Sequence, residues 1–186
     1  MTEARSATAI LIEEHSFVGM VMVAMERAAQ RIRAGDDVDV HAVEQMVEFT
    51  RGFTDGCHHA KEERFLFPRM LEATAEAKAP VSVMLREHEA GRARIAVISA
   101  GLEEARRGDA AARVKIAEDL DGYASLLRSH IAKENHVLFP LADRALGEDE
   151  KRGLAADFEQ VEQEEISAGR LQRFHALAEE LARESG

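Results

Sequence analysis

The stretch HHAKEERFLFP, residues 58–68, returns with few changes as HIAKENHVLFP, residues 130–140. The two stretches lie 72 residues apart and share a histidine, an alanine, a lysine, a glutamate and the closing Leu-Phe-Pro. Internal repetition at a fixed spacing is typical of a duplicated structural unit. The repeat therefore divides the chain into two related halves, and its polar residues are the first candidates for a functional site.

Only one of the two possible His and Glu pairs in this stretch is repeated. The residues that match are His58 with His130 and Glu62 with Glu134. The neighbours that do not match are His59 with Ile131 and Glu63 with Asn135. We therefore take His58 and Glu62 as the pair that does chemistry. His59 and Glu63 lie about 100° round a helix from that pair, which favours a flanking or solvent-facing place over a supplementary or supporting role.

A second alignment extends the repeat upstream. A shift of 73 residues places EEHSFVGMVMV (13–23) over REHEAGRARIA (86–96) and matches His15 with His88. Each half then consists of a segment with a single histidine followed by a segment with His-x3-Glu.

Gly- and Pro-containing breaks divide the chain into long helical segments. The breaks are AGDD (34–37), AKAP (77–80), RGDA (107–110) and LGED (146–149). The segments between them are roughly 3–34, 38–76, 81–107, 110–146 and 148–184. In the first four, apolar residues recur at threes and fours, as in amphipathic helices. Long helices with short connections fold back on their neighbours, so we expect an all-α, antiparallel up-down-up-down four-helix bundle over residues 1–146. Residues 147–186 are expected to form a C-terminal helical extension on the same domain, which caps one end of the bundle or, alternatively, makes a dimer contact.

The charge balance narrows the expected partners. The 186 residues include 35 acidic and 24 basic side chains, for a formal charge of −11. Without a basic stripe able to displace counterions from phosphates, we expect neither nucleic acid nor an anionic membrane as a partner. No uninterrupted apolar run approaches the roughly 20 residues of a membrane-spanning helix, and the first residues lack the features of a signal peptide. We therefore expect a cytoplasmic protein.

The repeated polar residues point to a metal pair. Residues four apart on a helix lie on one face, so each His-x3-Glu motif directs both side chains to one place. His15 and His88 lie on apolar stripes that face the bundle interior. The residues expected to converge there are His15, His58, Glu62, His88, His130 and Glu134. Ionised carboxylates would be very costly in an interior without partners, and bound metal ions remove that cost.

The ligand types restrict the metal. Imidazole and carboxylate suit iron, zinc or manganese, and inward-facing Glu and His on four helices is how dinuclear carboxylate sites are built in bundles. In the simplest allocation each metal takes two histidines while both glutamates bridge. This leaves fewer than six protein ligands per metal, with room for a bridging oxide or hydroxide and for a small exogenous molecule.

The order His, His-x3-Glu, His, His-x3-Glu, the two stretches quoted above and EHEAGR (87–92) resemble the hemerythrin-like HHE cation-binding domains over about residues 8–146. The resemblance implies a non-haem di-iron centre inside an up-down-up-down bundle, with the same six residues as ligands. It also implies reactions with dioxygen, peroxide or nitric oxide, and thus a role in oxidative or nitrosative stress.

The chain departs from the oxygen-carrying hemerythrins at two positions. Those carriers resemble it in the second helix, but they have a second histidine four residues further along the third helix, where this chain has Arg92, and an aspartate where it has Glu134. Loss of a neutral histidine donor tends to stabilise ferric iron, so reversible oxygen carriage is in doubt. An enzyme would be a peroxide- or nitric-oxide-consuming di-iron oxidoreductase. A sensor of the same oxidants, and an iron-handling or structural metal-binding protein without turnover, remain open.

Several other residues have two interpretations. Tyr123 lies on nearly the same helical face as His130, so its hydroxyl either bonds to a metal-bound small molecule or belongs to a core aromatic side chain. Cys57 is favoured as a small core residue over a redox-sensitive thiol. Glu159 and Glu162 would reach the metal only if the C-terminal segment folded across the open end of the bundle.

Overall fold

The computed structural model describes residues 6–165 and 168–184, and every regular element in these ranges is helical. The α-helices are α1 (Ala7–Ala34), α2 (Val40–Phe49), α3 (Phe67–Ala73), α4 (Lys78–Arg106), α5 (Ala110–Lys133), α6 (Phe139–Ala145), α7 (Glu148–Glu165) and α8 (Ala168–Glu184). The π-helical segments are η1 (Thr50–His59), η2 (Glu62–Leu66) and η4 (Glu134–Leu138), and η3 (Ala75–Ala77) is a 3₁₀ turn. The all-α prediction is confirmed, and the fold is consistent with a hemerythrin-like helical bundle.

The predicted breaks coincide with capping residues. Ser6, Asp39 and Asp109 each accept a hydrogen bond from a backbone N–H three residues on, and so cap α1, α2 and α5. Gly35 ends α1 with φ 110°, a left-handed conformation that favours glycine. At the AKAP break the helix begins earlier than predicted, at Lys78, because Pro80 falls in the first turn of α4, where its missing N–H costs nothing.

The second and fourth long segments are single helices with π-helical interruptions. Pro68 and Pro140 lie at the start of α3 and α6, and the residues before them keep helical dihedral angles, so neither proline ends its helix. In each case the preceding phenylalanine N–H bonds to the carbonyl of the repeated glutamate, five residues back: Phe67 to Glu62 and Phe139 to Glu134. The duplicated motif is therefore a duplicated π-helical turn.

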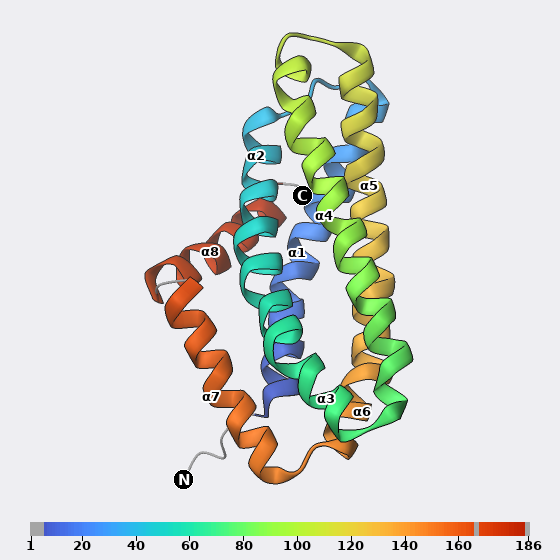
Figure 1. Cartoon of the computed structure of the whole chain (residues 1–186). Coiled ribbons are helices and arrows are strands. Elements are labelled where there is room, and N and C mark those ends of the chain that lie inside the picture. Colours follow the sequence, from blue (N-terminus) through green and yellow to red (C-terminus); the bar gives the residue numbers. More distant parts are fainter. Residues whose placement is uncertain (1–5, 166–167, 185–186) are drawn as a thin grey trace.

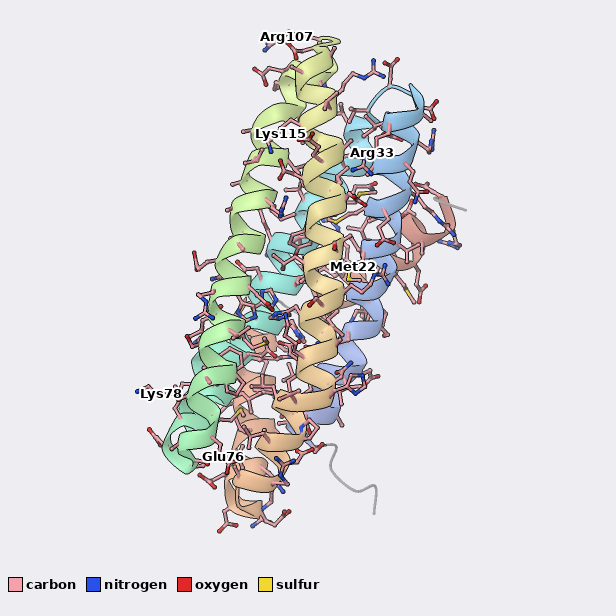
Figure 2. The ribbon with its side chains drawn as sticks, turned by 90° about the vertical axis from the view of Figure 1, so that its right-hand side faces the viewer. Met22, Arg33, Glu76, Lys78, Arg107 and Lys115 are labelled. Carbon is pink, nitrogen blue, oxygen red and sulfur yellow. The ribbon has the colours of Figure 1, made fainter. Side chains whose placement is uncertain are left out.

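The long segments lie side by side along one axis (Figure 1). In Figure 2, α4 runs from Lys78 near one end of the molecule to the turn at Arg107 at the other, with α5 between α4 and α1. Two apolar clusters fill the interior, one containing Val18, Phe53 and Ile95, the other containing Leu66 and Met84. Each long segment passes from one cluster to the other through its repeated His and Glu residues, which therefore form a polar layer between two apolar regions.

The C-terminal extension forms two helices, α7 and α8. Leu154 and Phe158 of α7 belong to one apolar cluster, whereas Phe174 and Leu177 of α8 belong to the other. Figure 1 shows α7 passing along the outside of the bundle and α8 lying beside α1 and α2. The extension thus packs along the side of the bundle and contacts both cores.

Helix α1 also passes a test for membrane-spanning segments, although its sequence has no uninterrupted apolar run of that length. Half of its most apolar 18-residue stretch is buried inside the protein. Core helices of this length and composition meet the same test, so the observation is weak evidence for a membrane.

Candidate metal centre

Four histidines turn the same ring nitrogen toward the middle of the polar layer. The Nε2 atoms of His15 and His58 lie 3.2 Å apart, and those of His88 and His130 lie 3.1 Å apart. The outward Nδ1 atoms each face an oxygen acceptor. The acceptors are Asn135 for His15 at 3.0 Å, Glu14 for His58 at 2.9 Å, Glu63 for His88 at 2.6 Å and Glu87 for His130 at 2.9 Å.

These partners set the tautomer of each imidazole. A carboxylate or amide oxygen only accepts, so Nδ1 carries the proton and the lone pair of a neutral ring lies on Nε2. In each histidine pair two lone pairs then face each other at close range, and they repel. A cation bound by both nitrogens converts this repulsion into two bonds.

The two repeated glutamates lie between the histidine pairs. Glu134 has one oxygen 3.0 Å from His15 Nε2 and the other 2.9 Å from His130 Nε2. Glu62 has one oxygen 4.0 Å from His58 Nε2 and the other 3.5 Å from His88 Nε2. Each carboxylate thus faces both histidine pairs.

Neither glutamate has a hydrogen-bond partner among the residues that the structure describes. Both side chains are 0% exposed, and none of their four oxygens has a hydrogen bond of acceptable geometry to any residue that the structure describes. Burial, and then the charge of Glu134, raise the pKa of Glu62 well above its usual range. Burial acts in the same direction on Glu134, whereas His130 and His15 in their protonated imidazolium forms hold the pKa of that carboxyl well below its usual range. Buried carboxylate oxygens without a partner are rare in folded proteins. Bound metal ions would supply the missing partners.

The potential ligand atoms form two groups, all of them buried. One consists of His15, His58 and Glu134, and the other of His59, Glu62, His88 and His130. The donor set of imidazoles and carboxylates suits iron, zinc or manganese, and the residues present therefore fit a metal pair.

Comparisons with known proteins agree with this geometry. The family described as the hemerythrin HHE cation-binding domain matches residues 6–142. The chain belongs to this family. Hemerythrin HHE domains bind metal cations, and this domain has two buried groups of His and Glu that could hold them.

Relatives of this HHE domain occur in mycobacteria. It is 27% identical over 152 residues to "Uncharacterized protein Rv1995" of Mycobacterium tuberculosis and, to the same extent, to "Uncharacterized protein Mb2018" of Mycobacterium bovis. The matched segment covers 82% of this chain but 59% of each relative. The chain therefore spans about three fifths of the length of these curated relatives. No solved structure gives a significant match.

The HHE domain brings all six sequence-predicted residues together, and it adds His59. His59 does not face solvent, as one part of the favoured interpretation had it, because its side chain is buried and its ring stacks on His88 at 3.8 Å between centroids. The α-helical spacing misled that prediction. In the π-helical segment η1 the turn is wider, so two adjacent histidines, His58 and His59, both reach the polar layer.

Glu63 supports the site as well. It accepts hydrogen bonds from His88 Nδ1 at 2.6 Å and from Arg92 at 2.7 Å, so the alternative, a role that supports the ligands, describes Glu63 better than the favoured flanking or solvent-facing one. Its repeat counterpart Asn135 holds His15 in the same way. Arg92, which replaces the histidine of the oxygen carriers, donates to Asp55, and Asp55 accepts from His59 at 3.3 Å. The arginine thus ties together the acceptors of two histidines.

Two further ion pairs were missed by sequence reasoning. Glu14 pairs with Lys61 as well as His58, and Glu87 pairs with Lys133 as well as His130. The signal was present, since the shift of 73 residues aligns the two glutamates and the shift of 72 aligns the two lysines. Hydrogen-bonded partners of this kind orient metal-binding imidazoles and raise their basicity.

A cavity of about 280 Å³ borders one of the two groups. Its lining includes His59, His88 and His130, together with Tyr123 and Arg92. Both interpretations of Tyr123 have support, because the residue lines this cavity and also belongs to an apolar cluster. Burial raises the pKa of Tyr123, and this effect outweighs a hydrogen bond with Thr50 that lowers it. The phenol is therefore protonated at neutral pH.

Cys57 is a fully buried member of the core, in agreement with the favoured interpretation. Burial raises the pKa of its thiol to about 12, which leaves little reactive thiolate at neutral pH. Glu159 is exposed, whereas Glu162 contacts Lys61 at 2.7 Å rather than a metal ligand.

Proposed function

We propose that this HHE domain holds two iron ions at its His and Glu groups and reacts with or senses a small oxidant such as dioxygen, peroxide or nitric oxide. One observation carries the proposal: two buried glutamates have four oxygens without a hydrogen bond to any residue that the structure describes, and each glutamate lies between two inward-facing histidine pairs. This arrangement supports the ligand set His15, His58, Glu62, His88, His130 and Glu134, with His59 as an addition. The iron would supply redox chemistry when bound.

The protein's own residues would control access to the centre. The cavity beside His59, His88 and His130 provides space for a small molecule next to one group. The protonated Tyr123 hydroxyl and the guanidinium of Arg92 border the same space and can donate hydrogen bonds. The apolar clusters on both sides exclude bulk water. A cytoplasmic location and a homodimer remain part of the proposal.

The bundle order belongs to the proposal too. The chain colours in Figure 1 alternate in direction along the four long segments, which supports an antiparallel up-down-up-down arrangement. That order places the repeated π-helical turns η2 and η4 at the same level of the bundle.

The experiment is to load the metal-free chain with Fe²⁺ without oxygen, count bound iron, and then add peroxide, dioxygen or nitric oxide. We expect two irons per chain and a visible spectrum that changes on addition of oxidant. Glu134→Ala should lose most of the iron, whereas Glu159→Ala, an exposed control, should not. Fewer than one iron per chain in the wild type would refute the dinuclear site. Full iron binding without reaction toward any of the three oxidants would favour iron handling instead.

A further inference from the structure

Helix α7 lies outside the region matched by the family, yet it contacts the support of one histidine. Glu162 on α7 lies 2.7 Å from Lys61 Nζ. Lys61 also pairs with Glu14, and Glu14 accepts a hydrogen bond from His58 Nδ1 at 2.9 Å. A continuous chain of charged contacts therefore leads from the C-terminal extension to an inward-facing histidine.

The internal repeat provides a comparison without α7. In the other half, Lys133 pairs with Glu87 and Glu87 accepts from His130. The side chain of Lys133 is 38% exposed, whereas that of Lys61 is 0% exposed. The difference arises from α7, whose Phe158 ring lies 5.7 Å from Lys61 Nζ. Water can solvate the ammonium of Lys133, but Lys61 depends on protein acceptors.

Because Lys61 is buried, its second carboxylate partner, Glu162, is important. A lysine ammonium has three donors, and a buried ammonium is costly unless it is paired and hydrogen-bonded. Glu162 supplies an acceptor from α7, so Lys61 is held between two carboxylates. Glu14 can then share its oxygens, one with Lys61 and the other with His58.

The position of Glu162 is itself well determined. Phe158, one turn earlier on α7, is fully buried in an apolar cluster with Leu154. Asp157 forms an ion pair with Arg69 at 2.5 Å, which ties α7 to α3. The helix that carries Glu162 is thus anchored independently of the contact with Lys61.

We propose that Glu162 is a positioning residue for the metal centre, which holds His58 through Lys61 and Glu14 and so makes the C-terminal extension part of the site. This inference rests on the proposed metal-binding function. It also makes the two metal positions unequal. The position formed by His15, His58 and Glu134 is supported by α7, whereas the position beside His59, His88 and His130 borders the cavity.

The test uses the full-length chain with Glu162→Ala, Glu162→Gln and the exposed control Glu159→Ala, titrated with Co²⁺ and followed by its visible absorption. We expect Glu162→Ala to lower the affinity for one of the two Co²⁺ ions by about 10–100-fold, which is the range for loss of a residue that orients a metal ligand. Glu162→Gln keeps an oxygen acceptor and should restore most of the affinity. Glu159→Ala should match the wild type.

A second measurement needs no metal. In the metal-free protein, the His58 Nδ1 proton should exchange with solvent faster in Glu162→Ala than in the wild type, while the His130 proton is unchanged, as followed by imidazole ¹⁵N NMR. The inference would be overturned if Glu162→Ala bound both Co²⁺ ions with wild-type affinity and its His58 proton exchanged at the wild-type rate. It would also be overturned if the variant lost affinity for both ions equally. Absence of metal binding by the wild type would instead refute the proposed function, and the exchange measurement would still decide the role of Glu162.

Discussion

Replacement of Glu62 by methionine should stabilise the metal-free protein and abolish most of its metal binding. Glu62 is 0% exposed, and neither of its oxygens has a hydrogen-bond partner among the described residues. Burial, and then the charge of Glu134, raise the pKa of the metal-free carboxyl well above its usual range. Methionine is unbranched and of similar length, and it removes the unpartnered polar atoms.

The magnitude follows from the cost of an unsatisfied buried polar group, about 1–3 kcal/mol. Glu62→Met should therefore raise the free energy of unfolding of the metal-free protein by about 2 kcal/mol. For a chain of this size that corresponds to a rise in Tm of about 4–8 °C. Metal at a hundred times its Kd stabilises the wild type by about 2.7 kcal/mol per site, and the variant should lose most of this gain.

The neighbouring position supplies the control. Glu63 accepts from His88 at 2.6 Å and Arg92 at 2.7 Å, so Glu63→Met should lower the free energy of unfolding by about 1–3 kcal/mol and weaken metal binding without abolishing it. The assay is denaturant unfolding of each variant after chelation, with and without Fe²⁺ in the absence of oxygen. A metal-free Glu62→Met protein less stable than the wild type would refute the reasoning, because it would mean that the carboxyl is satisfied within the protein.

Three other predictions concern the surroundings of the site. A Cβ at Gly52 would lie 2.2 Å from the Phe174 ring, so Gly52→Ala should displace α8 and lower the free energy of unfolding by about 1–3 kcal/mol; Gly19→Ala, which meets no atom within 4 Å, is the control. Burial lowers the pKa of His59 to about 3 from 6.5, against its hydrogen bond with Asp55. Between pH 3 and pH 6.5 only the unfolded chain binds a proton at His59, so the free energy of unfolding decreases as the pH falls, by about 2 kcal/mol at about pH 5. His59→Gln should reduce this dependence of stability on pH in chelated protein. An unchanged pH dependence would contradict the prediction. Tyr123→Phe should leave iron content unchanged but alter the spectral response to peroxide, and an identical response would assign the residue to the core alone.

Much of the fold could be predicted because it depends on local properties of the chain. The helical periodicity and the breaks with Gly35 and Gly108 determined the long helices to within a few residues. The repeated His-x3-Glu motifs indicated which side chains converge, since residues four apart share a helical face. Family membership followed from the same motifs and is confirmed by the match over residues 6–142.

The errors arose where the backbone departs from an ideal α-helix. The rule of 100° per residue separates His59 from His58, but the π-helical turn brings both into the polar layer. Single-sequence periodicity contains no signal for the π-helical turn of η1, because Pro68 lies beyond it and its missing N–H affects only the carbonyl four residues earlier. The supporting role of Glu63 was the less favoured interpretation for the same reason, although its repeat counterpart Asn135 occupies the related position.

The sequence by itself determined that the protein is helical, that it is duplicated, and that four histidines and two glutamates share one interior layer. Tertiary structure alone decided how unequal the two halves are. The contact between Glu162 and Lys61 joins residues a hundred positions apart, and the cavity is bounded by side chains from three long segments. Such contacts depend on how α7 packs across the bundle, and that packing is set by shape and burial over the whole chain rather than by the spacing of residues within one helix.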